Sequence, residues 1–245
     1  MQQVIDTAKY YNIAGLNVKM SSYGRTDQQA EAYKTDKAVH PDFEVKAKTY
    51  LLKDAYKNAS EELCEYLMSG YDFYKKLLDY DGLMLHSSAV VVNDRAYLFS
   101  ADPGTGKSTH TGLWLKLFGD RAYILNDDKP ALRLEEGIWY AYGTPWSGKD
   151  DISVNRRVPI AGIALIERSE TNEIYPFSGP EAIRQILAQT NRPKAAEYRI
   201  KLMELLDKLL TMVPIWKLKC NMDTSAAVLS YEVMSGEKFN ENENT

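Results

Sequence analysis

The residues best suited to chemistry lie in a glycine-rich segment that ends in a lysine and a serine. The run 101–109 reads Ala-Asp-Pro-Gly-Thr-Gly-Lys-Ser-Thr and directly follows the apolar stretch 97–99. It matches the pattern G-x-x-x-x-G-K-[ST], with alanine in place of the first glycine. Small residues let successive backbone N–H groups converge on phosphate oxygens. The segment therefore predicts a phosphate-binding loop.

The side chains of this loop suit a nucleoside triphosphate. Lys107 can reach the β- and γ-phosphates, and the Ser108 hydroxyl is a natural ligand for Mg²⁺. A helix expected over 109–118 would add its N-terminus to the phosphate site. The alternative, a glycine-rich turn with a chance Lys-Ser, is disfavoured by the strand before the loop and the helix after it. Nucleotide contacts are expected from Asp102, Pro103, Gly104, Thr105, Gly106, Lys107, Ser108 and Thr109.

A pair of adjacent carboxylates is the second chemical feature. Asp127 and Asp128 follow the apolar run 122–125, and Asp127 stands 20 positions after Lys107, which leaves room for a helix, a turn and a strand. We therefore expect the pair at the C-terminal end of a strand near the loop, where ligands collect. One carboxylate can hold Mg²⁺ and the other can accept a hydroxyl proton, and each should raise the pKa of the other. The alternative is a solvated Asn-Asp-Asp turn.

Three further side chains lie where they can meet a substrate. His86 leads into the strand expected at 89–92, which pairs with the strand that feeds the loop, so it can approach a γ-phosphate. Lys149, in a shaped loop after a hairpin, and Arg156 are candidates for contacts with phosphate or acceptor. The alternatives are a structural histidine, an ordinary turn and a solvated basic turn. His110 receives no role.

The elements that must position these groups form a mixed sheet with helices. Two hairpins flank the loop, at 89–99 and 131–142, and such hairpins exclude an all-parallel sheet. Leu63, Leu67, Tyr71 and Tyr74 give a helical spacing within 47–78, and short apolar pieces within 11–18 indicate strands. Further strands are expected at 160–167 and 213–220, and helices at 180–189, 194–212 and 224–234.

The composition limits the classes of protein to which this chain can belong. The 245 residues include 30 basic and 34 acidic side chains, a net charge of −4 that provides no general field for nucleic acid. No signal peptide and no run long enough to span a bilayer are recognised, and Cys64 and Cys220 are expected to be reduced, as in the cytoplasm. We expect an N-terminal β/α extension over 1–80 packed on a nucleotide-binding domain over 81–238 whose last third is helical, and a disordered tail over 239–245.

Taken in order, His86, the Gly104–Ser108 core and the Asp127–Asp128 pair resemble the HPr kinase/phosphorylase and phosphoenolpyruvate carboxykinase superfamily. The resemblance covers 83–128 and extends to the strand around Ile163 and to Arg168–Asn172. It implies a P-loop α/β domain with a mixed sheet that binds ATP and Mg²⁺ and phosphorylates a hydroxyl. Asp127 would then be the catalytic base, Ser108 and Asp128 the metal ligands, and Lys107 and His86 catalytic groups beside the γ-phosphate.

The chain also departs from that superfamily. Residues 1–80 do not resemble the N-terminal domain of HPr kinase, and the signature with which HPr kinase grips its protein substrate is not found. The nearest likeness is to small HPr-kinase-like proteins whose acceptor is a small molecule, a peptide or a protein serine. Alternatives are a nucleotide-binding regulatory module with weak or no ATPase activity, and carboxykinase-like chemistry. No nucleic acid or membrane partner is expected; homo-oligomers are common in the resembled family.

Overall fold

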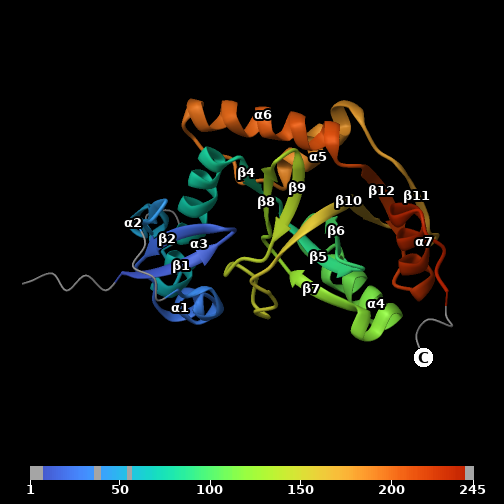
Figure 1. The fold of residues 1–245 in the computed structure, drawn as a ribbon, viewed down its shortest axis with the longest axis horizontal. Helices are drawn as coiled ribbons and strands as arrows, with labels where there is room; N and C mark the ends of the chain where they lie inside the picture. Colours follow the sequence, from blue (N-terminus) through green and yellow to red (C-terminus); the bar gives the residue numbers. More distant parts are fainter. Residues whose placement is uncertain (1–7, 36–39, 54–56, 241–245) are drawn as a thin grey trace, which may run out of the picture.

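The computed structural model describes residues 8–35, 40–53 and 57–240 as a mixed α/β protein with a curled sheet (Figure 1). A central sheet has helices on both faces, and an N-terminal group of strands and helices lies at one end of it. The mixed sheet expected from the two hairpins is confirmed. Among the described residues, no helix is long and apolar enough to cross a membrane.

The elements fall into an N-terminal and a central group. The N-terminal group consists of β1 (Lys9–Ile13), β2 (Leu16–Met20), α1 (Gly24–Gln29), β3 (Phe43–Val45), α2 (Tyr50–Lys53) and α3 (Glu61–Leu77). The central strands are β4 (Gly82–Met84), β5 (Ser87–Val92), β6 (Arg95–Ser100), β7 (Ala122–Asn126), β8 (Ala131–Glu135), β9 (Ile138–Tyr142), β10 (Arg157–Arg168), β11 (Glu173–Pro176) and β12 (Ile215–Cys220). The central helices are α4 (Lys107–Phe118), α5 (Gly179–Ala188), α6 (Ala196–Met212) and α7 (Thr224–Ser235).

Strand β10 joins the two halves of the central sheet. Its first residues pair antiparallel with β9, and its later residues pair parallel with β6 and β12. Strand β5 lies between β6 and β7 and is antiparallel to both, so β6 and β7 run in the same direction. The segments that follow β6 and β7 therefore emerge at the same edge of the sheet. This topology brings the phosphate loop and the acidic pair together.

Successive side chains along the central strands point to opposite faces of the sheet, and this divides the apolar core into two layers. Ala96 and Leu98 of β6 pack with α5 and α6, whereas Tyr97 and Phe99 pack with α4 and α7. The same alternation occurs in β5 and β10, because successive side chains of a strand point to opposite faces. Both faces of the sheet are thus covered, and only its edge is left for a ligand.

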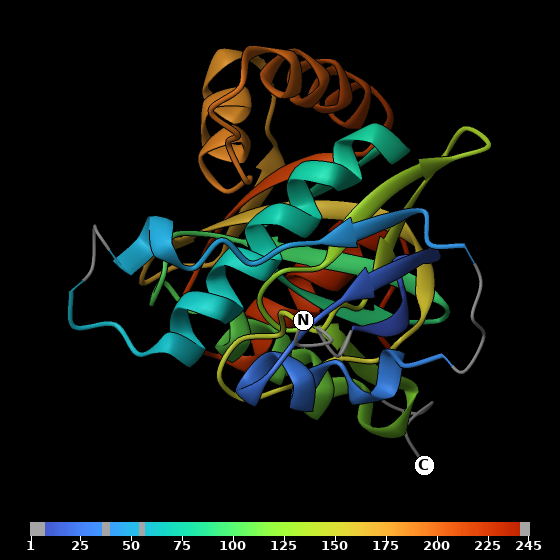
Figure 2. The ribbon, with the colours of Figure 1, turned by 90° about the vertical axis from the view of Figure 1, so that its left-hand side faces the viewer.

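The N-terminal group packs on the hairpin β8–β9 and the loop that follows it. A third apolar cluster combines residues of β1, β2 and α3 with Ala131, Tyr142 and Trp146. The Trp146 ring stacks on Phe73 at 4.8 Å, and a Cβ on Gly70 would lie 2.9 Å from the indole, so α3 needs glycine at that point. Figure 2 faces this group and shows α3 crossing in front of the central sheet.

The strands expected within 11–18 are confirmed: β1 and β2 form a hairpin, in which Ala14 and Gly15 adopt positive φ values of 53° and 76°. Other local predictions needed correction. Leu63 and Leu67 of the expected helical stripe are 41% and 42% exposed, since α3 turns Cys64, Tyr66, Met68 and Phe73 inward instead. Strands β4 and β11 were not predicted, and part of the expected tail, 241–245, lies outside the described residues.

The two cysteines are free and buried, which agrees with the prediction of reduced thiols. Burial raises the pKa of the Cys220 thiol to about 11. Such a thiol stays protonated near neutral pH and behaves as a small apolar side chain.

A buried carboxyl group makes the N-terminal group sensitive to pH. Glu65 of α3 is 1% exposed, accepts a hydrogen bond from Thr26 of α1, and has a second oxygen without a partner in the described part of the chain. Burial raises its pKa to about 7, and the hydrogen bond from Thr26 only partly opposes this. In the folded protein Glu65 is therefore protonated over a range in which the unfolded chain ionises it.

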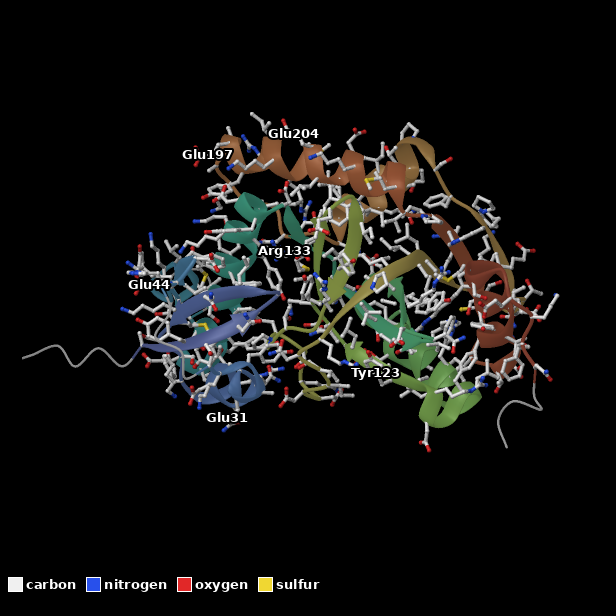
Figure 3. All side chains as sticks on the ribbon, viewed as in Figure 1. Glu31, Glu44, Tyr123, Arg133, Glu197 and Glu204 are labelled. Carbon is white, nitrogen blue, oxygen red and sulfur yellow. The ribbon has the colours of Figure 1, made fainter. Side chains whose placement is uncertain are left out.

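We predict that the protein loses stability as the pH rises from about 5 to about 8. The raised pKa corresponds to a loss of up to about 3 kcal/mol, complete once the pH has passed the folded-state value. Glu65→Gln should remove this slope, as measured by urea unfolding at several pH values. The exposed Glu204 on α6 (Figure 3) supplies the matched control, Glu204→Gln, which should keep the slope. An unchanged slope in Glu65→Gln would contradict the assignment.

Candidate functional site

The glycine-rich loop leaves β6 at Ala101 and enters α4 at Lys107. Gly104 and Gly106 have φ values of +76° and +121°, which residues with a Cβ rarely adopt. A hydrogen bond of 3.2 Å from Thr105 N to Asp102 O closes the turn between strand and helix. Gly106 caps α4 without a side chain, so the first N–H groups of the helix face the loop and can receive an anion.

Lys107 is held inside this loop among three carboxylates. Its side chain is buried, and Nζ donates to Ala101 O at 2.9 Å. Burial lowers the pKa of Lys107, while the negative charges of Asp128, Asp127 and Asp102 act in the opposite direction. The loop lysine and the acidic pair thus lie within electrostatic reach of each other, as the strand directions require.

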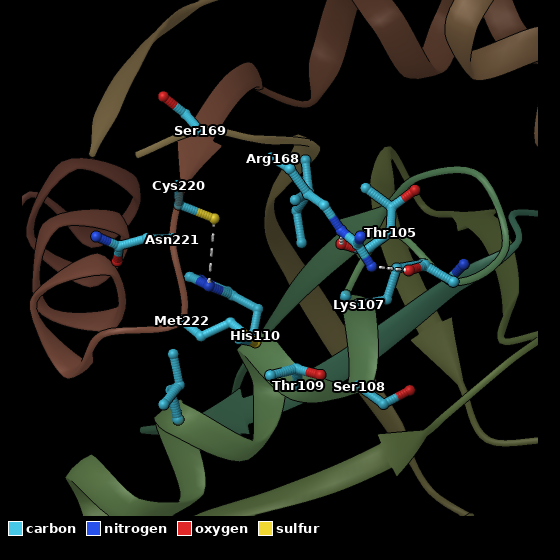
Figure 4. A pocket seen from close by; sticks show the side chains of 14 residues that line it. Thr105, Lys107, Ser108, Thr109, His110, Arg168, Ser169, Cys220, Asn221 and Met222 are labelled. Carbon is cyan, nitrogen blue, oxygen red and sulfur yellow. Dashed lines mark hydrogen bonds between the residues drawn. The ribbon is translucent and has the colours of Figure 1, made fainter. Parts of the chain in front are cut away.

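Arg168, at the end of β10, holds the loop from outside. Its Nε donates to Thr105 O at 3.1 Å and its Nη2 donates to Gly104 O (Figure 4). These bonds engage loop carbonyls and not the loop N–H groups, of which that of Thr105 already donates to Asp102 O. No role was predicted for Arg168 from the sequence. The parallel pairing of Leu165 with Ser100 explains why Arg168 reaches the loop.

Asn126 shapes the turn that presents the acidic pair. It is fully buried at the end of β7, and its Oδ1 accepts from the backbone N–H groups of Asp128 at 3.1 Å and Lys129 at 2.8 Å. Its Nδ2 donates to Thr144 O at 2.9 Å. An asparagine at this position forms an Asx-turn, so the Asn-Asp-Asp run is a rigid turn rather than a solvated one.

Asp128 is paired with two bases. Its Oδ1 lies 3.1 Å from His86 Nε2, and its Oδ2 forms an ion pair with Lys129. Burial alone would raise the pKa of Asp128, but the hydrogen bonds and charges of His86 and Lys129 outweigh it and lower the pKa. The expectation that the two aspartates raise each other's pKa is therefore wrong for Asp128, because the hydrogen bond from His86 and the charge of Lys129 lower its pKa.

Asp127 differs from Asp128 in having a carboxylate oxygen without a hydrogen-bond partner in the described part of the chain. Its backbone N–H donates to Ile152 O at 3.1 Å, and its Oδ1 is buried without a hydrogen-bond partner among the described residues. A buried polar atom without a partner is costly and rare in folded proteins. The Asp127 carboxylate is thus the group in this site that can still take a proton or a cation.

Gln189, just after α5, connects the loop to His86 and was not predicted. Its Nε2 donates to Asp102 Oδ1 at 2.8 Å, and its Oε1 lies 3.0 Å from His86 Nδ1. The backbone N–H of His86 also donates to Gln189 O at 2.8 Å. No local sequence signal points to Gln189, because it is 103 positions from His86.

The two remaining candidates, Lys149 and Arg156, differ in their position relative to the site. Lys149 is exposed and follows Gly148, where a Cβ would lie 3.2 Å from that of Asp128. The Arg156 guanidinium lies over the Tyr123 ring, 5.6 Å from its centroid. Tyr123 is near the start of β7, whereas the acidic pair follows its end. The structure therefore brings the loop next to Lys149 up to the site and does not bring the Arg156 side chain to it.

Two cavities flank the loop, with Arg168 and Thr105 lining both. One, of about 530 Å³, lies over α4 towards β12 and includes Leu113, Ile166 and Met222 (Figure 4). The other, of about 580 Å³, lies between the loop and α5 and includes charged groups from three elements. His110 packs beneath the first cavity, where burial lowers its pKa to about 4 and its Nε2 lies 3.0 Å from Ser230 Oγ. His110 is thus a buried core histidine, a position that the sequence had left open.

The donor set suits a hard cation. The Ser108 hydroxyl is exposed on the first turn of α4, and the acidic pair offers carboxylate oxygens at the same sheet edge. Mg²⁺ prefers one or two such oxygens together with phosphate and water. The Asp127 oxygen without a partner is open to such a cation, whereas the Asp128 oxygens also contact His86 and Lys129.

Comparisons with known proteins give a distant result. No protein-family model matches the sequence, and no curated protein resembles it closely enough to be recognised as a relative. Among solved structures, the chain is similar to the Hpr(Ser) kinase/phosphatase from Coxiella burnetii, with a TM-score of 0.36 and 14% identity over 62% of this chain and 95% of that one. A similarity of this size does not assign the chain to that family.

We predict that the loop depends on its positive-φ glycine. Gly106→Ala should destabilise the protein by about 1–3 kcal/mol, because the space around the new Cβ is open but the backbone angle is strained. Gly112→Ala, six residues later within α4, should stabilise by about 0.5–1 kcal/mol, because alanine favours a helix. Urea unfolding measures both. Equal effects of the two substitutions would show that the loop angle is not constrained.

Proposed function

We propose that this protein is a kinase that transfers the γ-phosphoryl group of ATP, with Mg²⁺, to a hydroxyl acceptor. The observation that carries the proposal is the convergence of Lys107 and the Asp127–Asp128 pair at one sheet edge. A loop that only bound nucleotide would need Lys107 and Ser108 but no carboxylate pair aimed at the same place. A phosphoryl transferase needs both.

The nucleotide would bind with its phosphates at the start of α4. The loop N–H groups and Lys107 would contact the β- and γ-phosphates, and the nucleoside would occupy the 530 Å³ cavity. That cavity offers apolar contacts from Leu113, Ile166 and Met222, which suit the face of a base. Asn221 and Ser169 lie at its rim and would be the polar neighbours of the base.

The metal would be held by Ser108 and a carboxylate of the acidic pair. When bound, Mg²⁺ neutralises charge on the β- and γ-phosphates. The resemblance assigns this role to Asp128, whose oxygens would be shared with His86 and Lys129. Asp127 is the second candidate for this ligand.

The acceptor would be activated by the acidic pair. As the acceptor oxygen bonds to the γ-phosphorus, the bond from that phosphorus to the β–γ bridging oxygen breaks and ADP departs. The acceptor proton would pass to the Asp127 carboxylate, whose Oδ1 has no hydrogen-bond partner among the described residues. Lys107 and His86 would offset the negative charge on the transferring group. The acceptor is proposed to be a small molecule, a peptide or a protein serine.

We predict that Asp127→Asn lowers phosphoryl transfer by at least about 10³-fold, because the amide cannot accept the proton, while ATP binding changes only a few-fold. Transfer is measured with γ-labelled ATP and Mg²⁺ in fractionated cell extract, and binding by thermal protection. Lys107→Met should lose the protection. The control, Asp207→Asn on the exposed surface of α6, makes the same chemical change away from the site.

Each remaining outcome has a definite meaning. Normal transfer by Asp127→Asn would overturn the assignment of the base. Protection by ATP without turnover in any fraction would support a nucleotide-binding regulatory module instead. Loss of nucleoside triphosphate only when oxaloacetate is added would support carboxykinase-like chemistry.

A further inference from the structure

We propose that the outer face of α3, formed by Leu67, Tyr71 and Lys75, is a docking surface for an acidic peptide segment of a partner protein. The carrying observation is that an aromatic cavity and a basic cavity adjoin on this face and share the wall formed by Tyr71. That the docked segment carries the phosphoryl acceptor rests on the proposed function. The surface itself does not.

The aromatic cavity is lined by the helical stripe that the sequence predicts in α3. Leu67, Tyr71 and Tyr74 of this stripe line it, and Leu67 is 42% exposed. Spacings of three and four residues place these side chains on one side of the helix. Another side of α3, with Phe73 and Leu77, packs in the apolar core. Part of the stripe therefore faces a cavity, and its apolar surface is available to a ligand.

The size of the aromatic cavity suits one apolar side chain. Its volume is about 190 Å³, and its lining includes Tyr66, Tyr74 and Trp146. A pocket that encloses a whole small molecule usually has about 300–1,000 Å³, so this cavity is too small for such a ligand. Aromatic rings offer a large apolar contact area to a neighbouring side chain. The cavity therefore fits one side chain of a larger partner.

The aromatic cavity lies beside the acidic pair. Lys129 lines it and forms an ion pair with Asp128. The hydroxyl of Tyr66, another lining residue, accepts from Gly148 N at 3.1 Å, and a Cβ on Gly148 would lie 3.2 Å from that of Asp128. His86 contacts the other oxygen of Asp128. A hydroxyl group next to the docked side chain would therefore lie close to the acidic pair.

The basic cavity lies on the other side of Tyr71 and has a volume of about 320 Å³. Its charged lining residues are four lysines and two acids: Lys46, Lys48, Lys75, Lys194, Asp72 and Glu197. Asp72 is already engaged, because it forms ion pairs with Lys75 and Lys76. Lys48 and Lys194 are exposed, and neither has an ion pair in the described part of the chain. The cavity thus has an excess of positive charge that a partner can neutralise.

Charge and shape together favour an acidic peptide. The excess of lysines attracts carboxylates locally, although the net charge of the whole chain is −4. Both cavities lie between α3 and the segment 191–198, so an extended chain can fill the two together. A nucleic acid is less suitable, because its regularly spaced phosphates would also meet Asp72, Glu197 and a negatively charged protein.

The test uses short synthetic peptides that carry a fluorophore. The first has a serine between two phenylalanines and glutamates at both ends. The second has lysines in place of the glutamates, and the third has alanines in place of the phenylalanines. Fluorescence anisotropy measures binding without nucleotide, so this readout does not depend on phosphoryl transfer.

Two pairs of variants separate the local charge from the net charge. Lys48→Glu combined with Lys194→Glu reverses the two charges that lack an ion pair. Lys116→Glu combined with Lys208→Glu is the matched control, with the same change in net charge at exposed positions of α4 and α6. The first pair should weaken binding of the glutamate peptide about tenfold at low salt, and the control pair less than about twofold, because exposed charges act over short distances.

A second comparison tests the aromatic cavity. The wild type should prefer the phenylalanine peptide to the alanine peptide, because the ring fills the cavity. Leu67→Gln should abolish this preference. Leu63→Gln, one turn earlier on the same stripe, should keep it, because Leu63 is 41% exposed but does not line either cavity.

Several results would overturn the docking surface. These are equal binding of the glutamate and lysine peptides, equal effects of the two lysine pairs, equal effects at Leu63 and Leu67, and tighter binding of polyuridylate RNA than of the glutamate peptide.

Transfer from γ-labelled ATP then tests the link to the proposed function. The Lys48→Glu, Lys194→Glu variant should raise KM for the glutamate peptide about tenfold and leave kcat nearly unchanged, because it alters docking and not the reacting groups. Peptide binding that follows the expected pattern without any transfer by the wild type would count against the acceptor role and leave the docking surface standing. Transfer that all the variants perform with the same KM would overturn the docking surface and leave the kinase activity standing.

Discussion

The site depends on one constraint: the carboxylate of Asp128 is largely removed from water and must be paired. Such a charge is tolerated only when opposite charges and hydrogen bonds replace its hydration. His86 and Lys129 supply them, one on each oxygen. These partners fix the segments that carry them, because His86 precedes β5 and Lys129 precedes β8. Gln189 and, through it, the loop residue Asp102 are then arranged around the same ring.

The directions of the strands in the central sheet are the second constraint on the site. Strand β5 is hydrogen-bonded to β6 on one side and to β7 on the other. The phosphate loop after β6 and the acidic pair after β7 therefore leave the sheet in the same direction. The N-terminal group covers the far end of this region. Gly148, beside Asp128, donates to Tyr66 Oη at 3.1 Å and accepts from Gln29 Nε2 at 2.8 Å. Residues 1–80 thus reach the edge of the proposed acceptor site, although no motif in them predicted this.

Local signals predicted the elements well where a short-range cause produces them. The Asn93–Asp94 turn has φ values of 52° and 53°, as a two-residue hairpin requires, and Gly119 ends α4 with a φ of 54°. Local signals predicted less well which face of a helix is buried, because that depends on tertiary packing. Leu63 and Leu67 fit a helical period, but the face of α3 that carries Tyr66 and Phe73 is the one that meets the sheet. Strand β11 exists only because β12 offers it an edge.

The sequence by itself determined the glycine loop, its lysine and serine, the adjacent aspartates and the strands and helices that carry them. These follow from contacts within a few residues, such as backbone angles, alternation and capping. The tertiary structure alone decided which side chains of the site are paired and that the pKa of Asp128 is lowered. Asp128 lies against a histidine 42 positions earlier in the chain, and Gln189 and Arg168 reach the loop from distant elements. Electrostatic energy depends on distance in space, so only folding could make Asp128 the paired carboxylate and leave Asp127 Oδ1 without a hydrogen-bond partner in the described part of the chain.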